Sequence, residues 1–335
     1  MMKSVKTLVA IVACFVFVLG VNIDLTTAKD ITIKYAAQQA IDHPILAFPK
    51  KLAEILEKKT NGSVKLRIYP GNTLAGYAIE PVRNGISDMQ ELVPGMGKDL
   101  VPWFQILDVP YFVMGREHFY KVADPRGPVI TEANKALASG NLTIVGIFNY
   151  GTRVLTMKKP VYSPADLNGV KIRVVPTKIW IETWKALGAS PVPMPTTEIQ
   201  PGLLTGAIDG QENSWHEIPG KALWDVQKYV METDHLMTLS VLWFNLKTWE
   251  SMSPEQQEAL RDAVSESRRW YEEDFTESKT REYRKLVVEK GMTIIGPKEG
   301  LKKDEFIARG RNVLNMFANQ WGEWPARIEA MGKSK

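Results

Sequence analysis

The chain has 335 residues, and its 42 basic and 38 acidic side chains leave a formal net charge of only +4. Charges of both signs are mixed along the predicted helices without a lysine–arginine cluster, which argues against a nucleic-acid partner. The four histidines are scattered and show no metal-ligand spacing, so neither a metal nor another cofactor is expected.

The N-terminus has the pattern of a secretory signal peptide. Lysines near the start precede an apolar run from Thr7 to Ile23, and small residues lead up to Ala28. We expect cleavage after Ala28, which removes residues 1–28. A membrane anchor is the alternative, because the run approaches the roughly 20 residues that a spanning helix needs. Cys14 is the only cysteine, so the mature chain would have no disulfide and no thiol chemistry.

The first half of the mature chain alternates strand-like and helix-like segments. A strand pattern at residues 31–35, a helical pattern at 44–59 and a strand pattern at 64–69 predict a βαβ unit. Further elements are expected at 88–92 (strand), 116–135 (helix), 142–148 (strand) and 153–157 (strand).

The length of the chain predicts two lobes with a cleft between them, because single cores usually stop growing at roughly 250 to 300 residues. We expect lobe I to comprise residues 29–150 and 239–278, and lobe II to comprise residues 151–238 and 279–335. The second lobe again alternates β and α, which makes the fold class α/β. A crossing strand is expected at 236–246.

A long helix is predicted after this crossing strand. Ser253 is a good N-cap, Pro254 suits the first helical position, and Gln256 completes a capping box. No glycine or proline interrupts the chain until Gly291, so the helix should outspan one lobe. A coiled coil is the alternative, but the apolar residues keep no sustained heptad.

Arg173 is the most informative single residue. It lies within the apolar strand pattern at 171–175, where an unpaired guanidinium would be very costly to bury. It therefore needs a carboxylate partner, which is either an internal acid or a ligand.

A series of short motifs follows along the chain: Asp42-His43-Pro44, Tyr69-Pro70-Gly71, Asp108-Val109-Pro110-Tyr111-Phe112, Arg116-Glu117-His118, Ser163-Pro164-Ala165-Asp166-Leu167, Lys171-Ile172-Arg173, Ala186-Leu187-Gly188-Ala189 and Asp209-Gly210-Gln211-Glu212-Asn213. In this order they resemble the solute-binding proteins of tripartite ATP-independent periplasmic (TRAP) transporters, a family that includes dicarboxylate, sialic acid and sugar-acid receptors. The resemblance implies a two-lobe periplasmic-binding-protein-like fold, with a ligand cleft between the lobes and a long helix spanning both. It also implies a periplasmic monomer that works with membrane permease subunits.

The same resemblance implies a binding site for a carboxylate. Arg173 would form a bidentate salt bridge with the ligand, and Asn213 would hydrogen-bond the same group or its neighbour. Arg153 occupies the family's second arginine position, where it binds another carboxylate, a hydroxyl, or only a structural acid.

Two positions depart from the family pattern, and two others are candidate rim contacts. Thr196 stands where a bulky aromatic residue often occurs, and Trp215 stands where a small residue or proline is more usual. Trp215 is either a pocket wall or part of the core near the hinge. Gln39 and Glu91 follow strands, where binding loops gather in α/β lobes.

The leading hypothesis is a receptor that captures an organic acid between its lobes, closes, and delivers it to an ion-coupled permease without covalent chemistry. A ligand-sensing receptor for a signalling partner is the second hypothesis. A hydrolase or lyase is less favoured, because the sequence has no Gly-x-Ser-x-Gly elbow and no zinc or phosphate motif.

Overall fold

The computed structural model describes residues 29–333, and the predicted signal peptide at residues 1–28 lies outside this range. The strands are β1 (Ile31–Ala36), β2 (Val64–Tyr69), β3 (Met89–Leu92), β4 (Leu142–Met157), β5 (Lys171–Val174), β6 (Ser190–Pro193), β7 (Gly210–Ser214), β8 (Tyr229–Met231), β9 (Met237–Asn245) and β10 (Thr293–Ile295). The α-helices are α1 (Ala47–Lys59), α2 (Glu80–Arg83), α3 (Arg116–Val122), α4 (Pro128–Leu137), α5 (Lys178–Ala186), α6 (Ile199–Thr205), α7 (Glu217–Gly220), α8 (Leu246–Glu250), α9 (Pro254–Trp270), α10 (Glu277–Glu289), α11 (Lys303–Arg311), α12 (Val313–Met316), α13 (Ala318–Trp321) and α14 (Trp324–Lys333).

The strands join in the order β2-β1-β3-β9-β4-β7-β5-β6, with β8 and β10 as a branch from β4. The predicted βαβ start is confirmed, because β1 and β2 pair in parallel across α1. Both β3 and β7 pair with neighbours that run antiparallel to them, namely β9 and β4. The sheet is therefore mixed, and the α/β class predicted from the sequence is correct.

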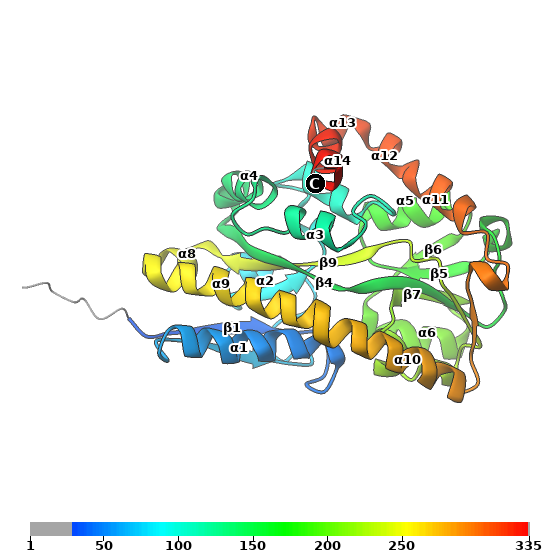
Figure 1. The fold of residues 1–335 in the computed structure, drawn as a ribbon, viewed down its shortest axis with the longest axis horizontal. Coiled ribbons are helices and arrows are strands. Elements are labelled where there is room, and N and C mark those ends of the chain that lie inside the picture. Colours follow the sequence, from blue (N-terminus) through cyan, green and yellow to red (C-terminus); the bar gives the residue numbers. More distant parts are fainter. Residues whose placement is uncertain (1–28, 334–335) are drawn as a thin grey trace, which may run out of the picture.

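Two long strands, β4 and β9, cross the middle of the molecule (Figure 1). They pair antiparallel from Leu142–Asn245 to Thr152–Met237, with an irregularity between Asn149 and Thr152. The prediction of two separate strands at 142–148 and 153–157 is wrong, because β4 runs through both ranges without a break. Gly151 has a φ of +119°, a conformation that lets the strand bend without ending. The strand β4 contributes buried residues to all three hydrophobic clusters.

The long helix is confirmed, with one local change of geometry. Its N-terminus has the predicted capping box, in which Ser253 Oγ accepts from the backbone N–H of Gln256 at 3.2 Å. Helix α9 continues through a π-helical turn, η8 (Tyr271–Thr276), into α10. Figure 1 shows this helical run along most of the length of the molecule. The single helix predicted at 116–135 is wrong, because a turn separates α3 from α4, which begins at Pro128.

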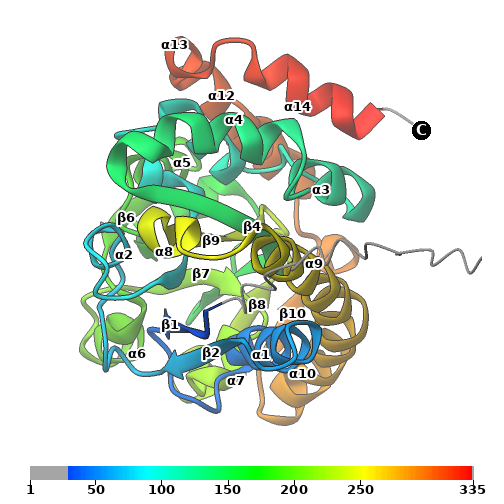
Figure 2. The ribbon, with the colours of Figure 1, turned by 90° about the vertical axis from the view of Figure 1, so that its left-hand side faces the viewer.

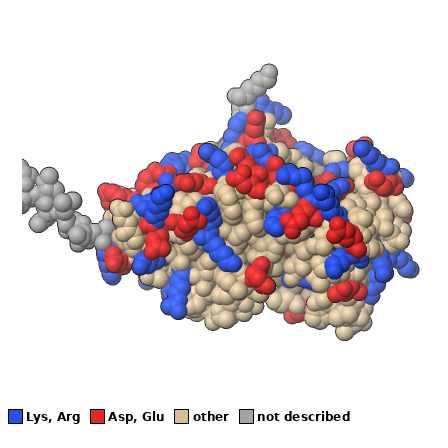
Figure 3. Space-filling model, turned by 60° about the horizontal axis from the view of Figure 1, so that its bottom comes forward, with Lys and Arg blue, Asp and Glu red and all other residues tan. Residues whose placement is uncertain are grey.

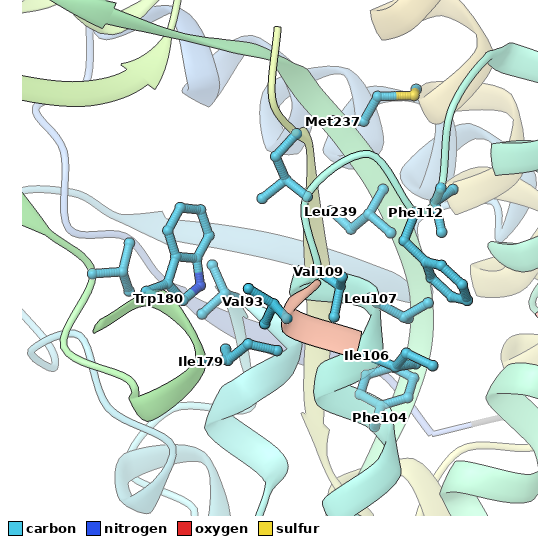
Figure 4. Packing of buried hydrophobic residues seen from close by; sticks show 14 of the residues in the cluster. Val93, Phe104, Ile106, Leu107, Val109, Phe112, Ile179, Trp180, Met237 and Leu239 are labelled. Atoms are coloured by element: carbon cyan, nitrogen blue, oxygen red, sulfur yellow. The ribbon is translucent and has the colours of Figure 1, made fainter. Parts of the chain in front are cut away.

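The helices cover both faces of the sheet. Figure 2 shows α1 and α9 together on one side, with α4 and α14 on the other. The last helices, α13 and α14, pack on the 3₁₀ segment η3 (Pro102–Asp108) and on α3, which are elements assigned to lobe I by sequence. Helix α5 shares a buried cluster with the same region, where Ile179 and Trp180 lie with Val93 and Phe104 (Figure 4).

The visible surface carries lysine, arginine, aspartate and glutamate side chains interspersed (Figure 3). Within residues 29–333 no helix is both long and apolar enough to cross a membrane. The same residues contain no cluster of histidine, cysteine, aspartate and glutamate suited to a metal ion.

Candidate ligand-binding site

A cavity of about 60 Å³ lies where the carboxyl ends of several strands meet the predicted hinge. Its walls come from both predicted lobes. The lining residues are Gln38, Gln39, Ile45, Tyr77, Glu91, Val93, Tyr150, Arg153, Arg173, Val175, Pro176, Pro195, Thr196, Asn213, Glu217, Thr238 and Ser240. Six of the seven residues predicted from the sequence are thus brought together at one cavity.

Arg173 lines the cavity from β5 and is only 3% exposed. Its Nε donates to the backbone oxygen of Met194 at 2.9 Å. No acidic side chain among residues 29–333 lies within ion-pair distance of its guanidinium. Burial lowers the pKa of Arg173 to about 10, so the guanidinium is still charged at neutral pH. The site therefore presents a buried cation that no acidic side chain contacts directly, although the carboxylates of Glu212 and Glu217 favour its charged form from a greater distance.

Arg153 has a different environment, although it is buried to the same extent. Its Nε and Nη2 contact the two carboxylate oxygens of Glu212 at 2.6 and 3.0 Å. Glu212 also contacts His235 Nε2 at 2.9 Å. Burial opposes ionisation of Glu212, but Arg153 and His235 hold its pKa below the usual value. The sequence left open whether Arg153 binds a ligand carboxylate, a hydroxyl or only a structural acid, and the structure shows a structural acid, Glu212. Arg153 Nη1 also donates to the Thr238 hydroxyl at 3.3 Å.

Asn213 and Thr196 lie on the same side of the cavity as the arginines. Asn213 is on β7, paired with Val154 of β4, and its Oδ1 accepts from the backbone N–H of Ser214 at 3.0 Å. Its amide NH₂ can still donate to a ligand. The buried hydroxyl of Thr196 has no hydrogen-bond partner in the described chain, which is unusual unless a ligand or water satisfies it.

Two carboxyl groups, those of Glu91 and Glu217, also line the cavity. Glu91, at 6% exposure, lies on β3. Burial, together with the nearby Glu217 carboxylate, raises the pKa of Glu91 to about 8, against the effect of a hydrogen bond from Ser240. Gln39 lines the same cavity, and its Oε1 is buried without a partner among the described residues.

Glu217 is the lining residue that sequence reasoning missed most clearly. It accepts from the Tyr150 hydroxyl at 2.6 Å and contacts Lys221 Nζ at 3.3 Å and His43 Nε2 at 3.5 Å. Burial alone would raise the pKa of Glu217, but Lys221, His43 and Tyr150 hold it at about 2. Its place just after β7 is the only signal that could have pointed to it.

Trp215 does not line this cavity. It packs in the cluster with Ile218 and Val154, and Arg284 lies over its ring at 5.4 Å. In a continuing strand, the side chains of Asn213 and Trp215 would lie on the same face of the sheet, because side chains alternate between the two faces. Strand β7 ends at Ser214, so this pattern does not extend to Trp215. Trp215 borders a different hollow, together with Glu272.

Comparison with known proteins identifies the family. Residues 35–320 match the family described as bacterial extracellular solute-binding protein, family 7 (DctP). The chain belongs to this family. It is 31% identical over 302 residues to the 2,3-diketo-L-gulonate-binding periplasmic protein YiaO of Escherichia coli K12, with 87% of each chain covered.

Solved structures of family members share the fold. A TRAP periplasmic solute-binding protein from Roseobacter denitrificans, with bound L-galactonate, superposes with a TM-score of 0.79 at 27% identity, covering 92% of this chain and 100% of the other. One from Xanthobacter autotrophicus Py2, with bound β-D-galacturonate, gives a TM-score of 0.79 at 26% identity, covering 89% and 99%. The family 7 protein described here therefore has the fold of a TRAP periplasmic binding protein, and its relatives bind solutes.

Proposed function

We propose that this family 7 protein is the periplasmic receptor of a TRAP transporter, that it captures a small organic acid, and that the carboxylate of the acid pairs with Arg173. The buried guanidinium without an internal counter-ion carries this proposal. Asn213 and Thr196 supply further polar groups at the same end of the cavity.

The class of acid follows from the relatives. Ligands named for the three relatives are 2,3-diketo-L-gulonate, L-galactonate and β-D-galacturonate. Each is a six-carbon acid that carries hydroxyl groups. The polar groups that line this cavity suit such a molecule, since they offer side-chain amides, hydroxyls and carboxylates for hydroxyl recognition. The cavity of about 60 Å³ must widen to hold it.

Capture requires only a shift between open and closed lobes. Residues of both predicted lobes can contact the ligand together only when the lobes are closed, so binding favours closure. In this proposal the signal peptide exports the chain, the monomeric receptor closes on the acid, and the permease receives it. The protein performs no covalent chemistry.

The test is calorimetric titration of residues 29–335, refolded to remove carried-over ligand, with hydroxy acids and their neutral sugar counterparts. We expect saturable binding of at least one acid and no binding of its neutral counterpart. Arg173→Ala should weaken binding of the acid by about 2 to 5 kcal/mol, which corresponds to a more than tenfold higher dissociation constant. Arg269→Ala, on the exposed face of α9, is the control and should leave the affinity unchanged.

Unchanged affinity in Arg173→Ala would refute the assignment of the carboxylate site. Conversion of the bound acid to a product, followed by NMR, would instead support an enzyme.

A further inference from the structure

Four charged side chains line the cavity, and they fall into two classes. Arg153 is paired with Glu212, and Glu217 is paired with Lys221. Arg173 and Glu91 form no ion pair with any residue that the structure describes, either with each other or elsewhere. The cavity thus contains one cation and one acid that are available to a ligand.

These two groups approach the cavity from opposite sides. Glu91 is on β3 and Arg173 is on β5, and the sheet order places β9, β4 and β7 between them. Neighbouring strands are separated by roughly 4.8 Å, so both side chains must extend inwards to reach one cavity. Tyr77 interacts electrostatically with both groups: burial and Glu91 raise the pKa of its phenol, and Arg173 lowers it. A ligand therefore meets Arg173 at one end and Glu91 at the other.

The group that meets Glu91 must satisfy a buried carboxyl. A hydroxyl can donate to the ionised form and accept from the protonated form, so it suits either state. A second carboxylate suits only the protonated form, because two like charges in a buried site repel strongly. Glu217 adds to this repulsion, because it lines the same cavity, acts electrostatically on Glu91 and is held ionised.

We propose, building on the function proposed above, that Glu91 makes this site selective for acids with a single carboxylate and a hydroxylated far end. Arg173 binds the carboxylate, and Glu91 binds a hydroxyl at the other end of the molecule. Diacids of the same length, in which that terminal hydroxyl group is oxidised to a carboxylate, are excluded by the ionised form of Glu91, and the nearby carboxylate of Glu217 acts in the same direction.

Matched pairs of acids test this directly. Galactonate and galactarate, gluconate and glucarate, and erythronate and meso-tartrate each differ only by oxidation of the terminal carbon. If a hydroxy acid of another length binds best, it is paired with its diacid in the same way. Titrations are performed at pH 9.0, where Glu91 is ionised. The other titratable groups that face Glu91 are Glu217, Tyr35, Tyr77 and Tyr271. Glu217 is already ionised, and the raised pKa values of the tyrosines keep them neutral.

We expect the wild-type protein to bind the monoacid more tightly than its diacid by on the order of 100-fold. Glu91→Gln removes the charge with little change in shape, so it should reduce this ratio by at least about tenfold. Glu250→Gln, on the exposed surface of α8, is the matched control and should keep the wild-type ratio.

Equal binding of monoacid and diacid by the wild-type protein, or an unchanged ratio in Glu91→Gln, would overturn the inference. In both cases dependence of binding on Arg173 would leave the proposed function intact. Absence of binding by every acid of the panel would overturn the proposed function, and the inference with it.

Discussion

Arg153 and Arg173 are each 3% exposed, yet only Arg153 has an internal counter-ion. The Arg153 guanidinium also lies 4.6 Å from the Trp180 ring centre, which adds a favourable cation–π contact. Its partner Glu212 is fully buried and depends on Arg153 and His235 for its charge. Arg153 therefore supports the structure of the site, whereas Arg173 has no acidic side chain in contact within residues 29–333 and is the arginine that we propose binds a ligand.

This difference predicts opposite effects on stability. Arg153→Ala leaves the Glu212 carboxylate buried without its main counter-ion, so the free energy of unfolding should fall by about 3 to 5 kcal/mol. Arg173→Ala removes a buried charge that no acidic side chain contacts, so the ligand-free protein should lose less than about 1 kcal/mol or become more stable.

Urea unfolding of both variants without ligand measures these values. Equal destabilisation by the two substitutions would contradict the distinction between a structural and a ligand-binding arginine.

At the scale of elements, β4 and the long helix connect the two sides of the molecule. Strand β4 pairs with β9, β7 and β8, and α9 packs across it. The helix and the strand meet closely at Gly146, where a Cβ atom would come within 2.4 Å of Val264 Cγ1. The absence of a side chain at Gly146 therefore allows the helix to lie directly on the strand.

Gly146→Ala should consequently reduce the free energy of unfolding by about 1 to 3 kcal/mol, because the added methyl group overfills a packed interface. Gly76→Ala is the control, since nothing lies within 4 Å of the Cβ that it would add. Gly146→Ala combined with Val264→Ala should be less destabilising than the sum of the two single changes, because the smaller side chain provides room. If the changes in the free energy of unfolding, measured in urea, are strictly additive, the contact between residues 146 and 264 is unimportant.

At the scale of the whole molecule, several buried acids affect the dependence of stability on pH. Burial raises the pKa of Glu91 to about 8 and those of Asp108 and Glu272 to about 7. The folded protein therefore retains protons that the unfolded chain has lost above about pH 4.5. In contrast, burial lowers the pKa of His216 to about 3, so this side chain is protonated below about pH 6.5 only after unfolding.

Between pH 6.5 and 8 the acids dominate, because His216 is unprotonated in the folded state and the unfolded chain, only about half protonated there at pH 6.5, loses that proton early in the range. The folded state binds more protons there, so the free energy of unfolding should fall as pH rises, by about 2 kcal/mol for Glu91 alone. Urea unfolding at pH 6.5 and 8.5 measures this change. Glu91→Gln should remove most of the part of this change that Glu91 causes. If the free energy of unfolding of the variant changes with pH as much as that of the wild-type protein, Glu91 does not titrate in this range.

Much of the fold could be predicted from short stretches of sequence. The start of α9 depends on Ser253, Pro254 and Gln256, which are adjacent in the chain. The break between α3 and α4 was missed, although Pro125, Gly127 and Pro128 lie within the predicted helix. The continuous β4 was also missed, because Gly151 resembles a chain break unless its pairing with β9 is known.

The sequence also predicted that Arg173 needs a carboxylate, because a cation within an apolar strand is costly wherever that strand packs. No acidic side chain of residues 29–333 contacts it, so a carboxylate from a ligand stays a prediction. Tertiary structure alone decided which arginine remains unpaired, since Glu212 lies 59 residues from Arg153. It also decided that Glu91 and Glu217 line one cavity together. A sequence shows which side chains carry charge, but the free energy of a charge depends on burial and on distances to groups that only folding brings together.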